Sequence, residues 1–156
     1  MASFYWYERE PELYENEVAA MRIFFPQFEL YKLNDGRLSW VGDVRPRAEA
    51  GARWTLQLVY DNNHPDNSTY GGSIRVYSIE PDLDLLYKRL GRLPHVLKDG
   101  ADHIYLCTAR AEDFEVNDNR TTTAVSALGW ACKWIFLFEE WLEGKNVGDE
   151  LFGHVY

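Results

Sequence analysis

Four strand-like segments follow one another without a long helical pattern between them, and this order constrains the fold more than any other feature. The segments are residues 27–33, 37–42, 54–61 and 73–79. Apolar and polar side chains alternate along 54–61, as in a strand with one buried face. Asn34-Asp35-Gly36 joins the first two segments and predicts a hairpin, because Asn and Gly accept positive φ. This spacing predicts an antiparallel meander instead of a parallel βαβ sheet.

A helix is predicted before the strands. Apolar residues recur there at the spacing of one helix face, at Tyr14, Val18, Met21 and Phe25. Pro26 is expected to end this helix, because proline lacks an N–H donor and clashes with the preceding turn. The acidic residues of the same segment, which we expect on the solvent side, are Glu12, Glu15 and Glu17.

A longer helix is predicted near the other end of the chain. It is expected to begin near residues 121–123, where a threonine can cap it, and to end after Leu142, before Gly144. The apolar face of this helix is predicted to consist of Trp130, Trp134, Leu137 and Trp141, with Ile135, Phe138 and Leu142 beside it.

The region between the fourth strand and the last helix shows a mixed pattern. Residues 82–90 predict a short helix, and residues 91–100 an irregular stretch through Pro94. A short apolar run over 103–108 follows, and then a charged loop over 109–120.

Composition excludes several classes of protein. With 156 residues, of which 46% are hydrophobic, we expect a single domain over residues 1–156 with a large core, and not a disordered chain. A net charge of −9 with scattered basic residues predicts no nucleic-acid partner. The densest apolar stretch, Trp134–Phe138, is too short for a bilayer, and no signal-peptide pattern is present. We therefore expect a cytoplasmic protein with no membrane partner and reduced cysteines.

The two cysteines have different surroundings in the sequence. Cys107 lies where an apolar run meets a polar loop, so its thiolate is a candidate nucleophile. Its alternative role is that of a small buried hydrophobic residue. Cys132 lies in the apolar helix between Trp130 and Trp134, where we expect it to pack in the core.

Two histidines precede Cys107 and suggest a Cys/His pair. If residues 103–107 are extended, His103 and Cys107 lie about 13 Å apart, too far for a direct hydrogen bond. His95 could return to Cys107 from the irregular stretch, or it could instead bond a loop carbonyl. No two histidines show the spacing of metal ligands, and residues 70–73 lack the lysine of a phosphate loop. We therefore predict no metal and no cofactor.

The order of elements around Cys107 resembles that of the ubiquitin-conjugating enzymes. That resemblance implies an α+β fold with an N-terminal helix, a four-stranded antiparallel meander, an irregular active-site segment and a C-terminal helix or helices. The residues that carry it are Trp40-Val41-Gly42, Trp54 to Tyr60 with His64-Pro65, Pro94-His95-Val96, Gly100 and Leu106-Cys107.

The last helix is similar to that of bacterial relatives of these enzymes. The matching residues are Trp130, Trp134, Phe138 to Gly144, Gly148 and Glu150. These relatives occur in anti-phage defence operons, either the short form of cyclic-oligonucleotide-based anti-phage signalling (CBASS) or bacterial ubiquitin-like conjugation operons.

The resemblance implies a cysteine-dependent acyl transferase. Cys107 would carry the C-terminus of a ubiquitin-like protein or of a partner nucleotidyltransferase as a thioester and transfer it to an amine. The implied partners are therefore proteins: a cyclic-oligonucleotide synthase, or a ubiquitin-like protein with its activating enzyme. His95 matches the family's structural histidine. The candidates for accepting the amine proton are Asp113, Glu112, Asn117 and His103.

One departure from the family pattern keeps other interpretations open. His95-Val96-Leu97 stands where the eukaryotic enzymes have His-Pro-Asn, so the asparagine that stabilises the oxyanion is absent. The first alternative is a non-catalytic binding module of the same fold that regulates a partner enzyme. The second is a cysteine hydrolase that cleaves protein tails.

Overall fold

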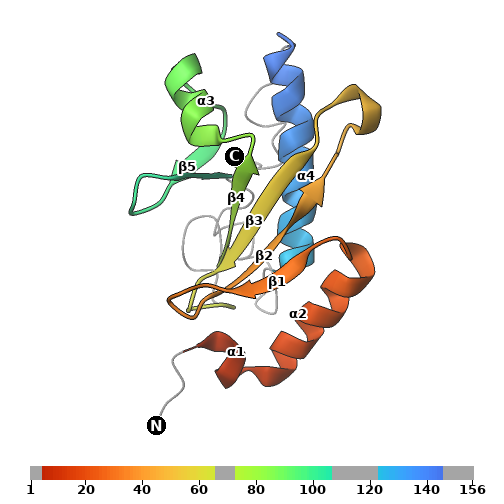
Figure 1. Ribbon diagram of the computed structural model, residues 1–156, viewed down its shortest axis with the longest axis vertical. Coiled ribbons are helices and arrows are strands. Elements are labelled where there is room, and N and C mark those ends of the chain that lie inside the picture. The colour runs from red at the N-terminus through yellow and green to blue at the C-terminus, as the bar shows by residue number, and fades with distance from the viewer. Residues whose placement is uncertain (1–4, 66–72, 107–122, 146–156) are drawn as a thin grey trace, which may run out of the picture.

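A computed structural model describes residues 5–65, 73–106 and 123–145. Its elements follow the predicted order of helix, strands and helix (Figure 1). In chain order they are α1 (Trp6–Arg9), α2 (Pro11–Phe24), β1 (Glu29–Lys32), β2 (Leu38–Val44), the 3₁₀ turn η1 (Ala48–Ala50), β3 (Trp54–Tyr60), β4 (Ile74–Glu80), α3 (Leu83–Leu90), β5 (Val96–Lys98), β6 (Ile104–Leu106) and α4 (Ala124–Leu142).

The sheet has six antiparallel strands in the order β1-β2-β3-β4-β6-β5. The predicted meander forms its first four strands, and the α+β class is confirmed. The prediction of only four strands is wrong, and so is an irregular course throughout 91–100, because β5 and β6 extend the sheet beyond β4. Each of these two strands has three residues, too few to display an alternating pattern in the sequence.

The predicted hairpin joins β1 to β2. The amide of Leu33 donates to the carbonyl of Arg37 at 2.8 Å, and the amide of Gly36 donates to that of Leu33 at 2.9 Å. Gly36 has a φ of +89°, which glycine adopts without the steric cost that a side chain would bring. The turn therefore requires a glycine at position 36, the residue type from which the hairpin was predicted.

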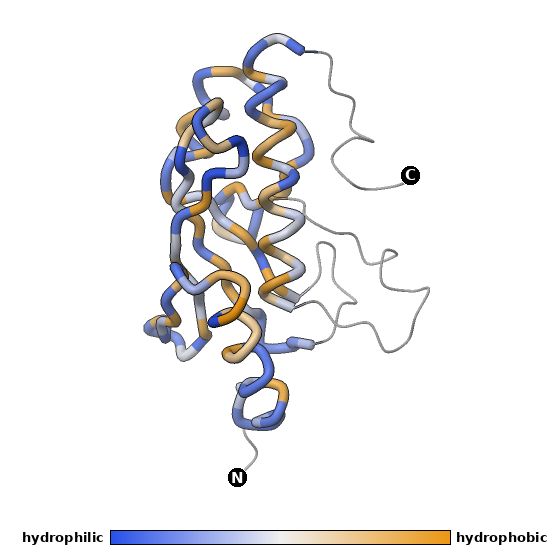
Figure 2. Tube along the Cα trace, turned by 90° about the vertical axis from the view of Figure 1, so that its right-hand side faces the viewer, coloured by the Kyte–Doolittle hydropathy of each residue, from blue (hydrophilic) through white to orange (hydrophobic). Residues whose placement is uncertain are grey.

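Helix α4 forms a second layer against one face of the sheet, as the edge-on view in Figure 2 shows. The sheet presents the alternating residues of β3 to this helix, and all four are buried: Trp54, Leu56, Leu58 and Tyr60. Rings from the two layers meet edge to face, with Trp54 and Trp134 centroids 6.1 Å apart. The alternation in the sequence thus identified the core face of the sheet.

The buried face of α4 agrees with the predicted one only in part, at Trp134, Ile135 and Phe138. Trp134 is fully buried, but Trp130, Leu137 and Trp141 are only partly buried. The face that packs on the sheet is Ala124, Ala127, Leu128, Ala131, Trp134, Ile135 and Phe138. Alanines let the helix axis approach the sheet closely. A face predicted mainly from the large aromatic residues of the helix leaves these alanines out. Within the described residues, no helix is both long and apolar enough to cross a membrane.

Glu17 is buried, so the prediction that it lies on the solvent side is wrong. Its Oε2 accepts hydrogen bonds from the Tyr60 hydroxyl at 2.6 Å and from the amide of Ala124 at 2.9 Å. Burial raises the pKa of this carboxyl, although the two hydrogen bonds oppose the shift. One side chain of α2 therefore joins β3 to the first residue of α4.

Candidate functional site

The segment with the candidate nucleophile begins where β6 ends. Cys107 follows Leu106 directly, and it lies outside the described residues, as do Glu112, Asp113 and Asn117. Leu106 is fully buried and pairs with Val76 of β4 and Val96 of β5. The chain therefore leaves the sheet toward Cys107 from a fixed, buried position.

His95 lies at this same end of the β5–β6 hairpin. It precedes Val96, and Val96 pairs with Leu106, so the two residues flank the point where the chain leaves β6. The backbone of His95 has a φ of +52°, in the left-handed region that few residues with a side chain adopt. The structure thus places His95 beside the point where the chain leaves β6, which is one of the two positions that the sequence left open for it.

The backbone carbonyl of His95 is held by the last helix. The indole Nε1–H of Trp134 donates to it, with 2.9 Å between nitrogen and oxygen. The Trp134 ring is itself fixed, because it is fully buried and stacks on Phe138 at 4.7 Å between centroids. The predicted alternative role for His95 was to bond a loop carbonyl, whereas in this contact its own carbonyl is the acceptor.

His103 lies at the other end of β6. Its Nδ1 is 3.0 Å from Oδ2 of Asp84, and Oδ1 of Asp84 accepts the amide of Ile104 at 2.9 Å. The hydrogen bond with Asp84 raises the pKa of His103. The three residues of β6 therefore stand between His103 and position 107 in the chain, and the expected separation of about 13 Å stays a prediction because Cys107 lies outside the described residues.

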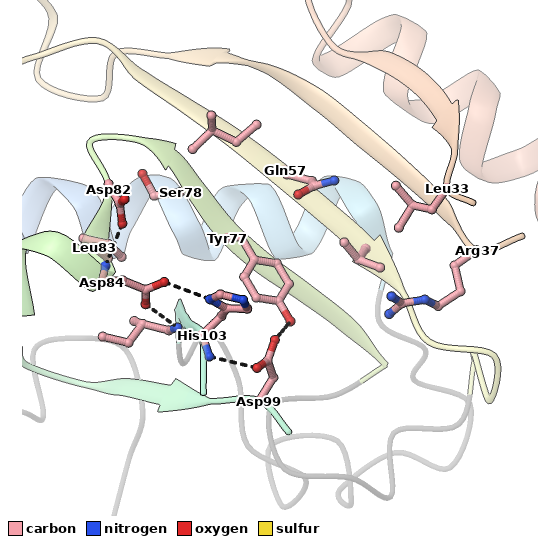
Figure 3. Close-up of a pocket in the computed structure, with 13 residues that line it drawn as sticks. Leu33, Arg37, Gln57, Tyr77, Ser78, Asp82, Leu83, Asp84, Asp99 and His103 are labelled. Carbon is pink, nitrogen blue, oxygen red and sulfur yellow. Dashed lines mark hydrogen bonds and ion pairs between the residues drawn. The ribbon is translucent and has the colours of Figure 1, made fainter. Parts of the chain in front are cut away.

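The turn between β5 and β6 is closed by Asp99 (Figure 3). Its Oδ1 accepts the amides of Ala101 and His103 at 2.9 Å each, and its Oδ2 accepts the hydroxyl of Tyr77 at 2.8 Å. Burial alone raises the pKa of Asp99, but these hydrogen bonds outweigh it and the net shift is downward.

These side chains line a cavity of about 420 Å³. It lies between α3, the β5–β6 turn and the face of β3 and β4 that points away from α4, as Figure 3 shows. Apolar residues such as Val59 and Ile104 share its wall with Arg37 and the acidic groups. The acidic groups already accept hydrogen bonds from their own chain, so they act first as turn and helix caps.

The start of α4 is equally well defined. Thr123 caps the helix, since its Oγ1 accepts the amide of Ser126 at 3.0 Å, and Ser126 Oγ accepts the amide of Thr123 at 3.0 Å. The amide of Ala124 donates to buried Glu17. The chain is thus anchored at Leu106 before the segment 107–122 and at Thr123 after it.

Cys132 and His64 both belong to the core region, as was predicted for Cys132. Cys132 packs against the core from α4, and burial raises the pKa of its thiol, which disfavours the reactive thiolate. His64 is buried against Trp6, and its Nδ1 lies 2.7 Å from Ser73 Oγ. Burial lowers the pKa of His64 to about 4, so the ring is neutral near pH 7.

Sequence reasoning did not assign a role to several of these residues. Asp99-Gly100 is a turn signal that could have identified the β5–β6 hairpin. Asp84, Tyr77 and the indole of Trp134 carry no comparable signal, because their partners are distant in the sequence. Among the described residues, no group of three or more His, Cys, Asp or Glu side chains is placed to hold a metal ion.

Comparison with known proteins gave one match. A family model described as type II CBASS E2 protein (E2-CBASS) matches residues 17–147. No curated protein and no solved structure was found to match the chain. The matched range contains β6, position 107, the anchors on both sides of the segment 107–122, and all of α4.

Proposed function

Since the chain belongs to the type II CBASS E2 protein family, we propose that it is an acyl transferase of anti-phage defence whose acyl carrier is Cys107. The family match confirms the expected resemblance to E2-like proteins of CBASS operons. It is the observation that carries the proposal, because it spans position 107 and the elements on either side. The fixed exit from β6 beside His95 supports this choice of cysteine.

Two transfer steps at Cys107 account for the proposed reaction. A free carboxylate does not acylate a thiol, so the acyl group must arrive activated, as a thioester or an acyl adenylate made by another enzyme. The Cys107 thiolate attacks the carbonyl carbon, the new C–S bond forms, and the donor thiolate or AMP leaves. An amine then attacks this thioester, a C–N bond forms, and the Cys107 thiolate is released.

The second step also releases a proton from the attacking amine. A nearby acidic or polar group must accept this proton for the amide to form. Asp113, Glu112 and Asn117 are the candidates from the loop that follows Cys107. His103 is a lesser candidate, since three residues of β6 separate it from Cys107 and its ring already pairs with Asp84.

The proposed acyl donor is a protein C-terminus. It belongs either to a partner nucleotidyltransferase that makes cyclic oligonucleotides or to a ubiquitin-like protein with its activating enzyme. A net charge of −9 suits a protein partner with basic surface groups better than a nucleic acid. We propose that the reaction takes place in the cytoplasm, where cysteines stay reduced.

Single cysteine variants test this function. The purified protein is incubated with ATP, an enzyme that activates the donor C-terminus, and the nucleotidyltransferase of its operon, and adducts are followed by intact mass with and without reducing agent. Cys107→Ala should abolish the reducing-agent-sensitive adduct, whereas the matched control Cys132→Ala should keep it. Retention of the adduct in both variants would show that neither cysteine alone is the carrier.

A binding module without catalysis is the second candidate. Its support is Leu97, which stands where the eukaryotic conjugating enzymes have the asparagine and which lies in β5, paired with Tyr105 of β6. An apolar side chain there cannot donate a hydrogen bond to an oxyanion. This candidate predicts that Cys107→Ala retains both tight binding to the partner and protection against phage.

A further inference from the structure

We propose that Trp134 is a positioning residue whose indole N–H fixes the backbone turn at His95 and, through it, the position of Leu106, from which the chain continues to Cys107. This inference rests on the proposed function, because it concerns the chemistry of that cysteine. It starts from one contact between segments far apart in the sequence: Trp134 Nε1–H donates to the His95 carbonyl at 2.9 Å.

The turn at His95 needs an external restraint. With a φ of +52°, His95 adopts a backbone conformation that a side chain makes unfavourable, and such residues persist where surrounding contacts hold them. Trp134 provides such a contact from a different layer of the molecule. Its ring is buried and has little freedom to follow a displaced carbonyl.

The restraint passes to Cys107 over a short path. Val96 is bonded to His95 and pairs with Leu106, and Leu106 is bonded to Cys107. A shift of the His95 turn therefore moves either the His95 side chain or the point from which the Cys107 segment leaves the sheet. Transfer reactions are sensitive to such shifts, since a misplacement of about 1 Å can slow a reaction about 100-fold.

The chain contains a matched control for this contact. Trp54 lies in the same aromatic cluster, with its ring 6.1 Å from that of Trp134, and it is equally buried. Its indole N–H has no hydrogen-bond partner among the described residues. Trp54→Phe therefore removes ring volume and a partnerless N–H, whereas Trp134→Phe also removes the bond to His95.

The two variants are compared in a Cys132→Ala background, where Cys107 is the only thiol. The rate of Cys107 alkylation by iodoacetamide is measured against pH, together with thioester formation and the backbone amide shifts of Val96 and Leu106. We expect Trp134→Phe to shift the pH midpoint of alkylation, to move both amide signals, and to slow thioester formation about tenfold. Trp54→Phe should change none of these by a comparable amount.

Equal effects of the two variants would overturn the proposal, because packing alone would then explain them. If Trp134→Phe does not fold, benzothienylalanine at position 134 keeps the ring size and replaces only the N–H with sulfur. If that protein has the same alkylation profile and the same Val96 and Leu106 amide shifts as the protein with Trp134, the proposal is also overturned. The proposed function fails separately, if Cys107→Ala retains the adduct, whatever the alkylation profiles show.

Discussion

The two ends of the β5–β6 hairpin are held in opposite ways. At the turn, Asp84 and Asp99 accept hydrogen bonds from His103, Tyr77 and backbone amides, on a wall open to solvent. At the other end, Leu106 is buried and one indole bonds the His95 carbonyl. Water competes for exposed hydrogen bonds, whereas a buried polar group that loses its partner stays unsatisfied.

This contrast shows that the side chains most typical of a reaction site do not lie at the end of the hairpin that leads to Cys107. Histidine, aspartate and tyrosine gather at the turn, which therefore resembles a reaction site. The end that continues into Cys107 is instead held by packing and by a backbone acceptor. We infer that the turn mainly stabilises the hairpin, while the buried end determines how the Cys107 segment is presented.

The largest expected effect comes from the buried end. Leu106→Ala removes a fully buried side chain between β4 and β5, which should cost about 2–5 kcal/mol of unfolding free energy. Urea denaturation followed by far-UV circular dichroism measures it. The control is Lys98→Ala, an exposed position on the same hairpin, which should change stability by less than about 1 kcal/mol. If the two variants lose similar amounts of unfolding free energy, the buried end of the hairpin is no more important for stability than its exposed positions.

The turn should show a smaller cost and an acid dependence. Asp99→Ala leaves two amides and the Tyr77 hydroxyl without this acceptor, and should cost about 1–2 kcal/mol because water partly replaces it. The folded pKa of Asp99 lies below its ordinary value of 3.8. Its contribution is therefore present above that value and disappears as pH falls through the folded pKa.

Denaturation at several pH values measures this dependence. The difference between the wild type and Asp99→Ala should be constant near neutral pH and should shrink at strongly acid pH. A difference that persists unchanged into strong acid would mean that the carboxylate charge does not stabilise the turn. Asp99→Asn, which keeps one acceptor oxygen, is the matched variant and should lose less.

The backbone at His95 can be tested apart from its imidazole. Both His95→Asn and His95→Ala remove the ring, but asparagine tolerates left-handed φ better than alanine. We expect His95→Ala to be less stable than His95→Asn by about 1 kcal/mol, as measured by thermal denaturation. Equal stability would mean that the left-handed turn is not maintained in solution.

The sequence predicts the long elements of this architecture better than its short ones. Periodicity located β3, α2 and α4, because each is long enough to repeat its pattern, and the Asn34-Asp35-Gly36 turn signal located β1 and β2. It missed β5 and β6, whose pairing depends on Val76 and on the Asp99 turn. It also placed Glu17 in solvent, since a helical pattern cannot show that Tyr60 and Ala124 supply donors to a buried carboxylate.

The candidate site was predictable in part. Residue order indicated Cys107 and His95, and extended geometry argued that His103 lies too far from Cys107 for direct contact. The bond between Trp134 and the His95 carbonyl joins positions 39 residues apart and involves a backbone atom, so no side-chain pattern reports it. Three-dimensional packing alone brings those two groups together.

The smallest expected effect concerns His103, and it has the opposite pH dependence to that of Asp99. The folded pKa of His103 is raised above 6.5 by Asp84, so its contribution is present below 6.5 and disappears as pH rises through the folded value. His103→Asn should therefore lower the melting temperature slightly at about pH 5.5 and not at about pH 9. An equal loss at both pH values would show that packing, not charge, explains the effect.

Because β6 separates this pair from Cys107, the same variant should leave the pH profile of Cys107 alkylation unchanged. A shifted profile would mean that the two ends of the hairpin are coupled, and that the turn acts on the chemistry of Cys107.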